Sequence, residues 1–284
     1  NHDNGTVLRS VNGASNTIVR RSAGSYLIFN INQYNGVPVT NCIIDGFTIR
    51  EGNVSAVYMA KGAIRNCMFI ANSGGTYGAI NMVGGSVSNC IFAGNSATAD
   101  GGGIHMKAPG GLVANCVFTN NTVGRWGGGI EFENTTAGAA IRNCLIARNR
   151  SVSQGGGISV FGAACRIENC TVVSNVSANS DGGYPPLGGG GIWISTGNAY
   201  MTNTIVWSNS ATVGTNISGT ISAWYSCSPD LADGVNSNIT ADPRFVNAPE
   251  ADYRLQKSSP CINRGTNLPW MTGAMDMGGN PRIL

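Results

Sequence analysis

The chain has 284 residues and a formal net charge of +3, and 41 of its residues are glycine. A composition of 42% hydrophobic and 11% charged residues excludes a disordered chain, and this much glycine excludes an ordinary helical domain. The basic residues are scattered, so we expect no nucleic-acid partner, and no apolar stretch approaches the ~18 residues that would predict a transmembrane segment.

Residues 1–40 show no clear repeat, whereas residues 41–209 are dominated by one. The dipeptide Asn-Cys recurs every 23 to 28 residues, and a seventh copy, 34 residues further on, has Thr in place of Cys. Most copies extend to Asn-Cys-x-(Phe/Ile/Val)-x-x-Asn, as in Phe92 with Asn95. The copies are Asn41-Cys42, Asn66-Cys67, Asn89-Cys90, Asn115-Cys116, Asn143-Cys144, Asn169-Cys170 and Asn203-Thr204. A repeat of about 25 residues indicates a solenoid.

Two further motifs complete each repeat. A glycine motif such as Gly102-Gly103-Ile104 follows at a variable distance, and a short apolar run such as Leu112-Val113 precedes the next Asn-Cys. We therefore predict three short strands per coil of 23–28 residues, with the variable linker as a loop. The fold class is all-β, a right-handed parallel β-helix of the pectate-lyase-like kind. Residues 1–221 should form the coils and 222–284 an irregular C-terminal coil and cap of the same domain.

Stacked coils should place identical residues ~4.8 Å apart in ladders. The asparagines of the Asn-Cys pairs are expected at turns with their amides hydrogen-bonded along the column. The six cysteines from Cys42 to Cys170 are expected to point inward as free thiols, in preference to disulfides or a zinc site, because their spacing matches no zinc signature. Cys165, Cys227 and Cys261 fall outside this pattern, and a bridge between Cys227 and Cys261 stays open. We expect no metal or other cofactor.

The combination of Phe92-Ala93-Gly94-Asn95 with Gly102-Gly103-Ile104 resembles the repeat of the bacterial polymorphic outer membrane protein family. The tail is similar to the C-terminal end of choice-of-anchor β-helix proteins. The tail motifs are Tyr225-Ser226-Cys227, Ala241-Asp242-Pro243-Arg244-Phe245-Val246, Asp252-Tyr253-Arg254-Leu255 and Ser259-Pro260-Cys261-Ile262. The two likenesses cover residues 37–282. They imply a β-helix at the bacterial cell surface, with further segments at both ends, and they bring no catalytic residues.

The strand after the glycine motif carries the best candidate site. Its outward positions should form one row of Asn81, His105, Glu131, Ser159 and Trp193, with Lys107 beside Glu133 in a second row. The loops before this strand add Asp100, Arg125, Trp126 and Tyr184 on the same side. An imidazole beside a carboxylate can perform acid-base catalysis, and Trp126 and Trp193 can stack on sugar rings.

A structural interpretation of this site is preferred. Opposite charges on adjacent strands stabilise an exposed sheet without any ligand. The motifs Asn-Thr-Asp, Gly-His-Gly and Arg-Ile-Lys that would indicate a polygalacturonase are absent, and the clustered carboxylates of a calcium-dependent lyase are not seen. An insertion between Asn175 and Leu187 predicts a long loop on the same side, and two interpretations have equal weight: a loop that binds a ligand, or a surface loop without a role in binding.

These patterns predict a secreted or bacterial cell-surface protein, associated with the outer membrane. The leading hypothesis is a non-catalytic structural or adhesive β-helix that contacts a glycan or polysaccharide. Because strand edges at the solenoid ends can pair with another copy, the hypothesis includes head-to-tail self-association. The alternative is a polysaccharide lyase or glycoside hydrolase that uses His105, Glu131, Lys107, Glu133 and Arg125.

Overall fold

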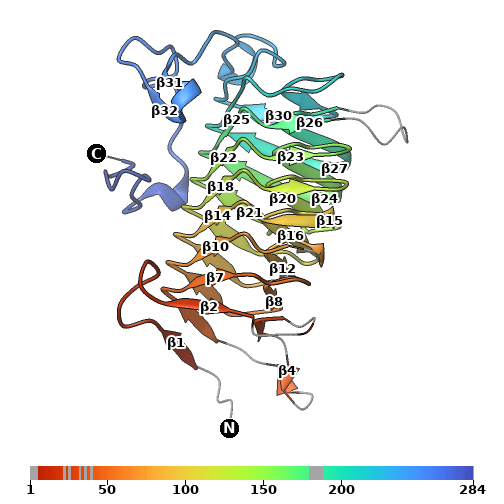
Figure 1. Ribbon diagram of the computed structural model, residues 1–284. Helices are drawn as coiled ribbons and strands as arrows, with labels where there is room; N and C mark the ends of the chain where they lie inside the picture. The colour runs from red at the N-terminus through yellow and green to blue at the C-terminus, as the bar shows by residue number, and fades with distance from the viewer. Residues whose placement is uncertain are drawn as a thin grey trace.

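The protein, seen as a computed structural model, is a parallel β-helix. Short strands wind into coils that stack along one axis, with the N-terminus at one end of the stack (Figure 1). The structure describes residues 6–21, 24, 27–31, 33–34, 37–38, 41–73, 75–178 and 188–283. The predicted parallel solenoid is confirmed.

The strands after the Asn-Cys turns from Asn66 onward belong to one eight-stranded sheet, here called the Asn-Cys sheet, whereas the strand after Asn41-Cys42 belongs to another sheet. Its members are β2(Ile18–Arg20), β7(Thr48–Arg50), β10(Met68–Ile70), β14(Ile91–Ala93), β18(Val117–Thr119), β22(Leu145–Ala147), β25(Thr171–Val173) and β28(Ile205–Trp207). The middle residue of each strand points inward, so Phe69, Phe92 and Phe118 stack face to face with centroids 4.8 and 4.6 Å apart. This separation is the spacing of neighbouring strands.

The linker that was expected as a loop contains a further short strand in five coils. These strands form the linker sheet, whose members are β11(Gly75–Tyr77), β15(Ser96–Asp100), β19(Thr122–Val123), β23(Arg150–Ser151) and β26(Val176–Ser177). The strands are as short as two residues, which gives too little alternation to identify them from sequence. Pairing with the neighbouring coil stabilises them, as in Ala97 with Val123.

The remaining coil strands form one 15-stranded sheet with two sections. The glycine-motif strands are β3(Phe29–Ile31), β8(Val57–Met59), β12(Ile80–Met82), β16(Ile104–Lys107) and β20(Ile130–Glu133). The return strands are β1(Val7–Arg9), β6(Ile43–Asp45), β9(Ala63–Arg65), β13(Ser86–Ser88), β17(Leu112–Ala114) and β21(Ala140–Arg142). Two long strands, β24(Ile158–Glu168) and β27(Ile192–Thr202), run through both sections, and β29(Ile217–Ser218) and β30(Ile221–Trp224) pair with β27.

Small elements lie at the two ends of the solenoid. They are the hairpins β4(Gln33–Tyr34) with β5(Val37–Pro38) and β31(Phe245–Asn247) with β32(Asp252–Leu255), and the 3-10 helices η1(Val235–Ser237), η2(Ala248–Glu250) and η3(Pro269–Met271). Among the described residues, we find no helix of the length and hydropathy that would cross a membrane.

A buried amide ladder runs along one corner of the core. It consists of the second asparagine of each repeat, and its members are Asn72, Asn95, Asn121, Asn149, Asn175 and Asn209. Each of these side chains accepts two hydrogen bonds through Oδ1 from the asparagine of the preceding coil or, at Asn72, one from Gly52 N. Each Nδ2 also donates to a backbone carbonyl of the preceding coil, for example from Asn121 to Phe92 O. The ladder satisfies buried turn groups that strands of this length leave unpaired.

The asparagines of the Asn-Cys pairs have a different role. All seven adopt the left-handed conformation, with φ between 51° and 61°, which Asn tolerates better than most residues. The six from Asn66 to Asn203 lie in one column, whereas Asn41 precedes the return strand β6, and Gly46 occupies the position before Asn66. Their amides form an interrupted column, with hydrogen bonds such as those from Asn89 to Asn66 and from Asn203 to Asn169. The position recurs once more in the chain, because Tyr225 has φ 49° and Ser226 accepts a bond from Thr204 N. The coil pattern thus extends beyond residue 221.

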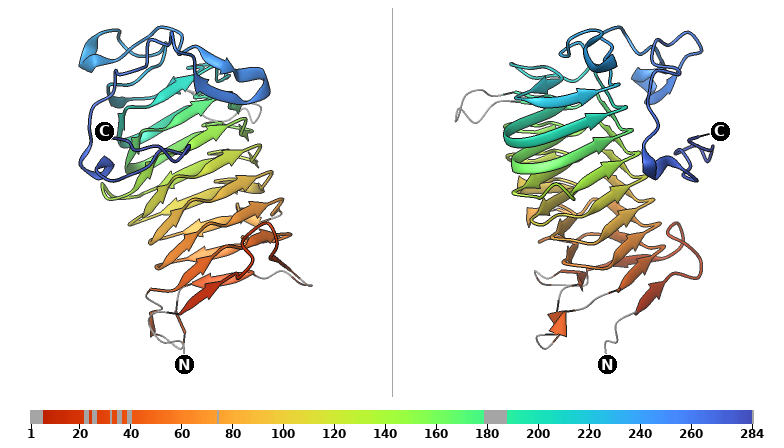
Figure 2. Two further views of the ribbon diagram at one scale, coloured as in Figure 1. Left: turned by 90° about the vertical axis from the view of Figure 1, so that its left-hand side faces the viewer. Right: turned by 180° about the vertical axis from the view of Figure 1, so that it is seen from behind.

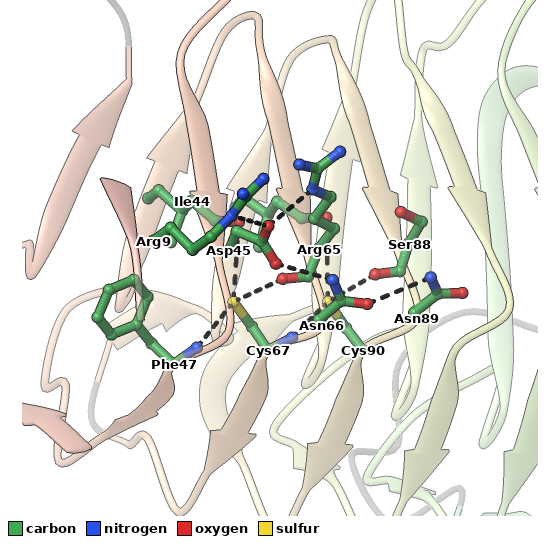
Figure 3. A network of polar contacts seen from close by, with 11 residues as sticks. Arg9, Ile44, Asp45, Phe47, Arg65, Asn66, Cys67, Ser88, Asn89 and Cys90 are labelled. Carbon is green, nitrogen blue, oxygen red and sulfur yellow. Dashed lines mark hydrogen bonds and ion pairs between the residues drawn. The ribbon is translucent and has the colours of Figure 1, made fainter. Parts of the chain in front are cut away.

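Behind this column lies the column of cysteines (Figure 3). Cys67, Cys90, Cys116, Cys144 and Cys170 form this column as buried free thiols. The expectation for Cys42 is wrong, because this half-buried thiol directly precedes the return strand β6, and Phe47 occupies the position before Cys67 in the column. Each buried thiol donates to the carbonyl two residues earlier, as Cys67 does to Arg65 O at 3.2 Å. The backbone N–H of Cys67 in turn donates to Cys90 Sγ at 3.4 Å. The column therefore joins neighbouring coils through sulfur as well as through backbone.

The two described ends of the solenoid differ. At the N-terminal end, β1, β2 and β3 each pair with one strand only, and Val7, Leu8 and Ile18 are exposed. At the other end the chain leaves the last coil and turns back along the side of the stack (Figure 2). This C-terminal segment contacts the turn asparagines in reverse order, through Thr266 O from Asn203 and Met275 O from Asn143. Before it turns back, the chain adds residues 225–239 to the last coil, where Cys227 bridges both Ile205 and Ile239. These residues occupy part of the strand edge that a head-to-tail partner would need.

Candidate functional site

The candidate residues meet where the linker sheet turns into the glycine-motif strands. In β16 and β20, His105 pairs in register with Glu131 and Lys107 with Glu133. Asp100 at the end of β15 forms a β-bridge with Trp126, which lies at the equivalent position of the next coil. Because the two sheets meet at an angle, their outward side chains converge on one corner.

The central pair is buried, although the sequence suggested an exposed sheet. His105 is 0% exposed and Glu131 is 1% exposed. The Tyr77 ring stacks on the imidazole of His105, with centroids 4.0 Å apart and an interplanar angle of 3°. Tyr77 comes from the linker strand of the preceding coil, which the sequence did not predict. The expectation of an open acid-base pair on the surface is therefore wrong for the described structure.

Charged residues surround the buried pair. His105 Nε2 lies 3.0 Å from Glu133 Oε2 and 3.6 Å from Glu131 Oε2, so the shorter contact is the hydrogen bond. Lys107 Nζ lies 3.4 Å from Glu133 and donates to the Tyr77 hydroxyl at 3.1 Å. The Lys107 and Glu133 side chains are 36% and 30% exposed, so they form the outer rim of the cluster.

Burial controls the protonation of both central groups. It lowers the pKa of His105 to about 3, and the nearby Lys107 charge acts in the same direction. Burial also raises the pKa of Glu131 well above its usual value, with the charges of Asp100 and Glu133 contributing. At neutral pH we therefore expect a neutral imidazole, donating through Nε2 to Glu133, beside a neutral carboxylic acid.

A second part of the cluster contains Asp100, Arg125 and two tryptophans. Arg125 forms a two-pronged ion pair with the buried Asp100, and the carboxylate raises the pKa of this guanidinium. The guanidinium carbon lies 4.1 Å from the Trp126 ring centroid. Trp126 also stacks on Phe161 at 4.9 Å and tilts against the buried Trp193 at 5.8 Å. The tryptophan proposed for sugar stacking is thus already in contact with protein groups.

The structure brings together His105, Glu131, Lys107, Glu133, Asp100, Arg125, Trp126 and Trp193. Tyr184 lies outside the described residues, as does most of the insertion to which it belongs. The sequence analysis missed Tyr77, although an aromatic residue directly before the glycine motif, as at Trp126, was the available signal.

Acid-base chemistry at this cluster is limited by its closure. Neither His105 nor Glu131 is accessible to a polymeric substrate, because the two residues are 0% and 1% exposed. His105 Nδ1 and Glu131 Oε2 are buried without a hydrogen-bond partner. Among the described residues, no group of three or more His, Cys, Asp or Glu is placed to hold a metal ion.

A cavity of about 460 Å³ lies elsewhere, between the last coils and the C-terminal segment. Its lining includes Asn169, Asn203, Cys227, Cys261 and Arg264. None of the predicted catalytic residues contributes to it.

The fold and its columns define the class of protein as a parallel β-helix repeat protein. Residues 27–211 match the family described as right-handed β-helix region, so the chain belongs to that family and the coils are right-handed. Neither the curated proteins nor the solved structures contain a match to this chain.

Proposed function

We propose that this chain is a non-catalytic structural and adhesive β-helix, secreted or displayed on a bacterial surface. The observation that carries the proposal is the closure of the acid-base cluster in the described part of the chain, in which His105 and Glu131 are buried. Burial lowers the pKa of His105 and raises that of Glu131, so both groups are expected to be neutral at neutral pH. A hydrolase or lyase needs such groups within hydrogen-bond reach of a substrate. Here the Tyr77 ring covers the imidazole instead.

The adhesive part of the proposal rests on the rim of the same cluster. Arg125, Lys107 and Glu133 keep part of their side chains exposed, next to the half-buried rings of Tyr77 and Trp126. Tyr77 and Trp126 are two coils apart, so the rim extends along the solenoid axis. A polysaccharide lying along this axis would meet ring edges and polar groups from successive coils.

The charges of the cluster favour a neutral glycan as the ligand. Arg125 and Lys107 are balanced by Asp100 and Glu133, and Glu131 is uncharged because its pKa is raised. A cluster with no net charge provides little attraction for a polyuronide or a sulfated polymer. We therefore expect contact with neutral polysaccharides, through hydrogen bonds and ring edges.

A paired binding and turnover assay tests this function. The purified chain is applied to an array of neutral and acidic glycans, and each polymer is then examined for new reducing ends or unsaturated products. We expect binding without cleavage, weakened by Arg125→Ala and Lys107→Ala but unaffected by the control Arg166→Ala on an exposed return-strand position. Cleavage that disappears in Glu131→Gln and His105→Ala would establish the enzyme instead.

Self-association is tested separately by sedimentation at rising concentration. Head-to-tail addition would require the C-terminal segment to leave the last coil, so we expect monomers for the folded chain. Concentration-dependent growth of the particles would show that the N-terminal edge of β1, β2 and β3 recruits another copy.

A further inference from the structure

Two cysteines outside the repeat meet at the C-terminal end. Cys227 is buried in the last coil, where it bridges to Ile205 and Ile239. Cys261 is half-buried in the C-terminal segment, just after Ser259 and Pro260. Both line the 460 Å³ cavity, and each thiol shifts the pKa of the other, as close neighbours do.

We propose that Cys227 and Cys261 form a disulfide that fastens the C-terminal segment to the last coil. The pair fits this role because Cys227 belongs to the last coil and Cys261 to the C-terminal segment, and both residues line the same cavity. In an oxidising environment outside the cell such a bond would persist.

The ladder cysteines do not fit the same chemistry. They occupy successive strands of a parallel sheet in one register, so their Cα–Cβ bonds run side by side instead of converging, as a disulfide requires. Cys165 is fully buried with its pKa raised to about 12 by desolvation, which suppresses the reactive thiolate.

The two thiols have distinct roles in forming the bond. The Cys227 thiol, together with Ser259, lowers the pKa of Cys261, whereas the pKa of Cys227 is raised. The more exposed Cys261 thiolate attacks one sulfur of a small-molecule disulfide and releases one thiol. Cys227 then attacks Cys261 Sγ and releases the second thiol, so that two protein thiols and one disulfide give a protein disulfide and two free thiols.

The bond would secure a segment that is otherwise held by polar contacts. Beyond Cys261 the segment contacts Asn203 through Thr266, with bonds of 2.7 and 2.8 Å, and reaches Asn143 through Met275 O. These contacts can open one by one, since each contributes little free energy alone. A covalent bond at Cys261 keeps the start of the segment in place while they re-form.

Thiol counting on the complete chain tests the proposal. The reduced protein has nine thiols, and after incubation with oxidised glutathione we expect two fewer under denaturing conditions. Tryptic mapping should then link the peptide 258–264, which carries Cys261, to the peptide 167–244, which carries Cys227 and Cys170. Cys227→Ser should abolish this link, whereas a link that persists in that variant would involve Cys170 and overturn the assignment.

Limited proteolysis supplies the second measurement. Cleavage within residues 262–283 should slow by at least ~10-fold in the oxidised protein relative to the reduced one. The control Cys261→Ser, in which a half-buried thiol becomes a hydroxyl, should be cut at the reduced rate in both conditions. Nine thiols after oxidation, or equal cleavage rates despite a Cys227–Cys261 bond, would refute the proposed fastening.

Discussion

Replacing Asn121 by alanine is the most direct test of the amide ladder. Asn121 is completely buried and forms four side-chain hydrogen bonds of 2.8 to 3.0 Å, with Asn95, Phe92 and Asn149. Alanine would leave Asn95 N and Phe92 O without the side-chain partner. An unsatisfied buried group costs about 1–3 kcal/mol, so we expect a loss of about 2–6 kcal/mol in the free energy of unfolding.

Guanidinium denaturation measures this loss from the midpoint at constant slope. Asn121 does not have the left-handed φ of Asn120, so alanine introduces no backbone strain that would confuse the result. The control Asn198→Ala, at an exposed strand position, should change the unfolding free energy by less than ~0.5 kcal/mol. A loss below ~1 kcal/mol for Asn121→Ala would refute the claim that the ladder stabilises the coils.

Asn121→Asp separates hydrogen bonding from packing. The carboxylate keeps the volume and still accepts from Asn95, but its second oxygen would face Phe92 O and Asn149 Oδ1, to which the amide now donates. We expect it to be less stable than Asn121→Ala at neutral pH, with part of the loss recovered in acid as the carboxylate is protonated. Equal stability of the two variants would show that the donated bonds contribute little.

Three further predictions concern other features of the coils. Phe92→Ala removes the central ring of the phenylalanine stack, and chemical denaturation should show a loss of about 3–5 kcal/mol. In Gly128→Ala the new Cβ would lie 2.2 Å from Gly156 O, so its melting temperature should fall well below that of Gly138→Ala, whose nearest atom is 4.0 Å away. The pKa of His105 is about 3 in the folded protein and 6.5 in the unfolded chain. As the pH falls from 8 to 5, only the unfolded state takes up this proton, so the free energy of unfolding should fall by about 2 kcal/mol. Urea titrations of His105→Gln should not show this loss at acid pH. Glu131→Gln should become more stable relative to the native protein as the pH rises above 4.5, because the native carboxyl has a raised pKa and must stay protonated in the fold.

The coil architecture could be predicted from sequence because stacking repeats the same environment in every coil. Asn-Cys from Asn66 onward, the inward Phe and the glycine motif recur at one period, and each occupies one column in the structure. The first Asn-Cys copy, at Asn41 and Cys42, has the same sequence but lies before the return strand β6 instead. The pairing of His105 with Glu131 followed from the same register. Contacts between residues one repeat apart could therefore be predicted from the sequence pattern.

Contacts between different columns could not be predicted in this way. The closure of His105 depends on Tyr77, which approaches from another sheet at an angle that the repeat does not encode. The docking of Met275 on Asn143 joins positions 132 residues apart, and no periodicity relates them. The linker strands were missed because two or three residues carry too little pattern and are stabilised by pairing alone.

The columns also indicate which residues to examine for function. A column that keeps one residue type, such as the buried asparagines or phenylalanines, is explained by stacking, because each member stabilises the next. The outward column Asn81, His105, Glu131, Ser159 and Trp193 changes at every coil, so stacking of like residues does not explain it. The fully buried members of that column must fit the residues that pack over them, as His105 fits under the Tyr77 ring. The partly exposed neighbours Lys107, Arg125 and Glu133 are free of both constraints, and a ligand outside the coils can reach them.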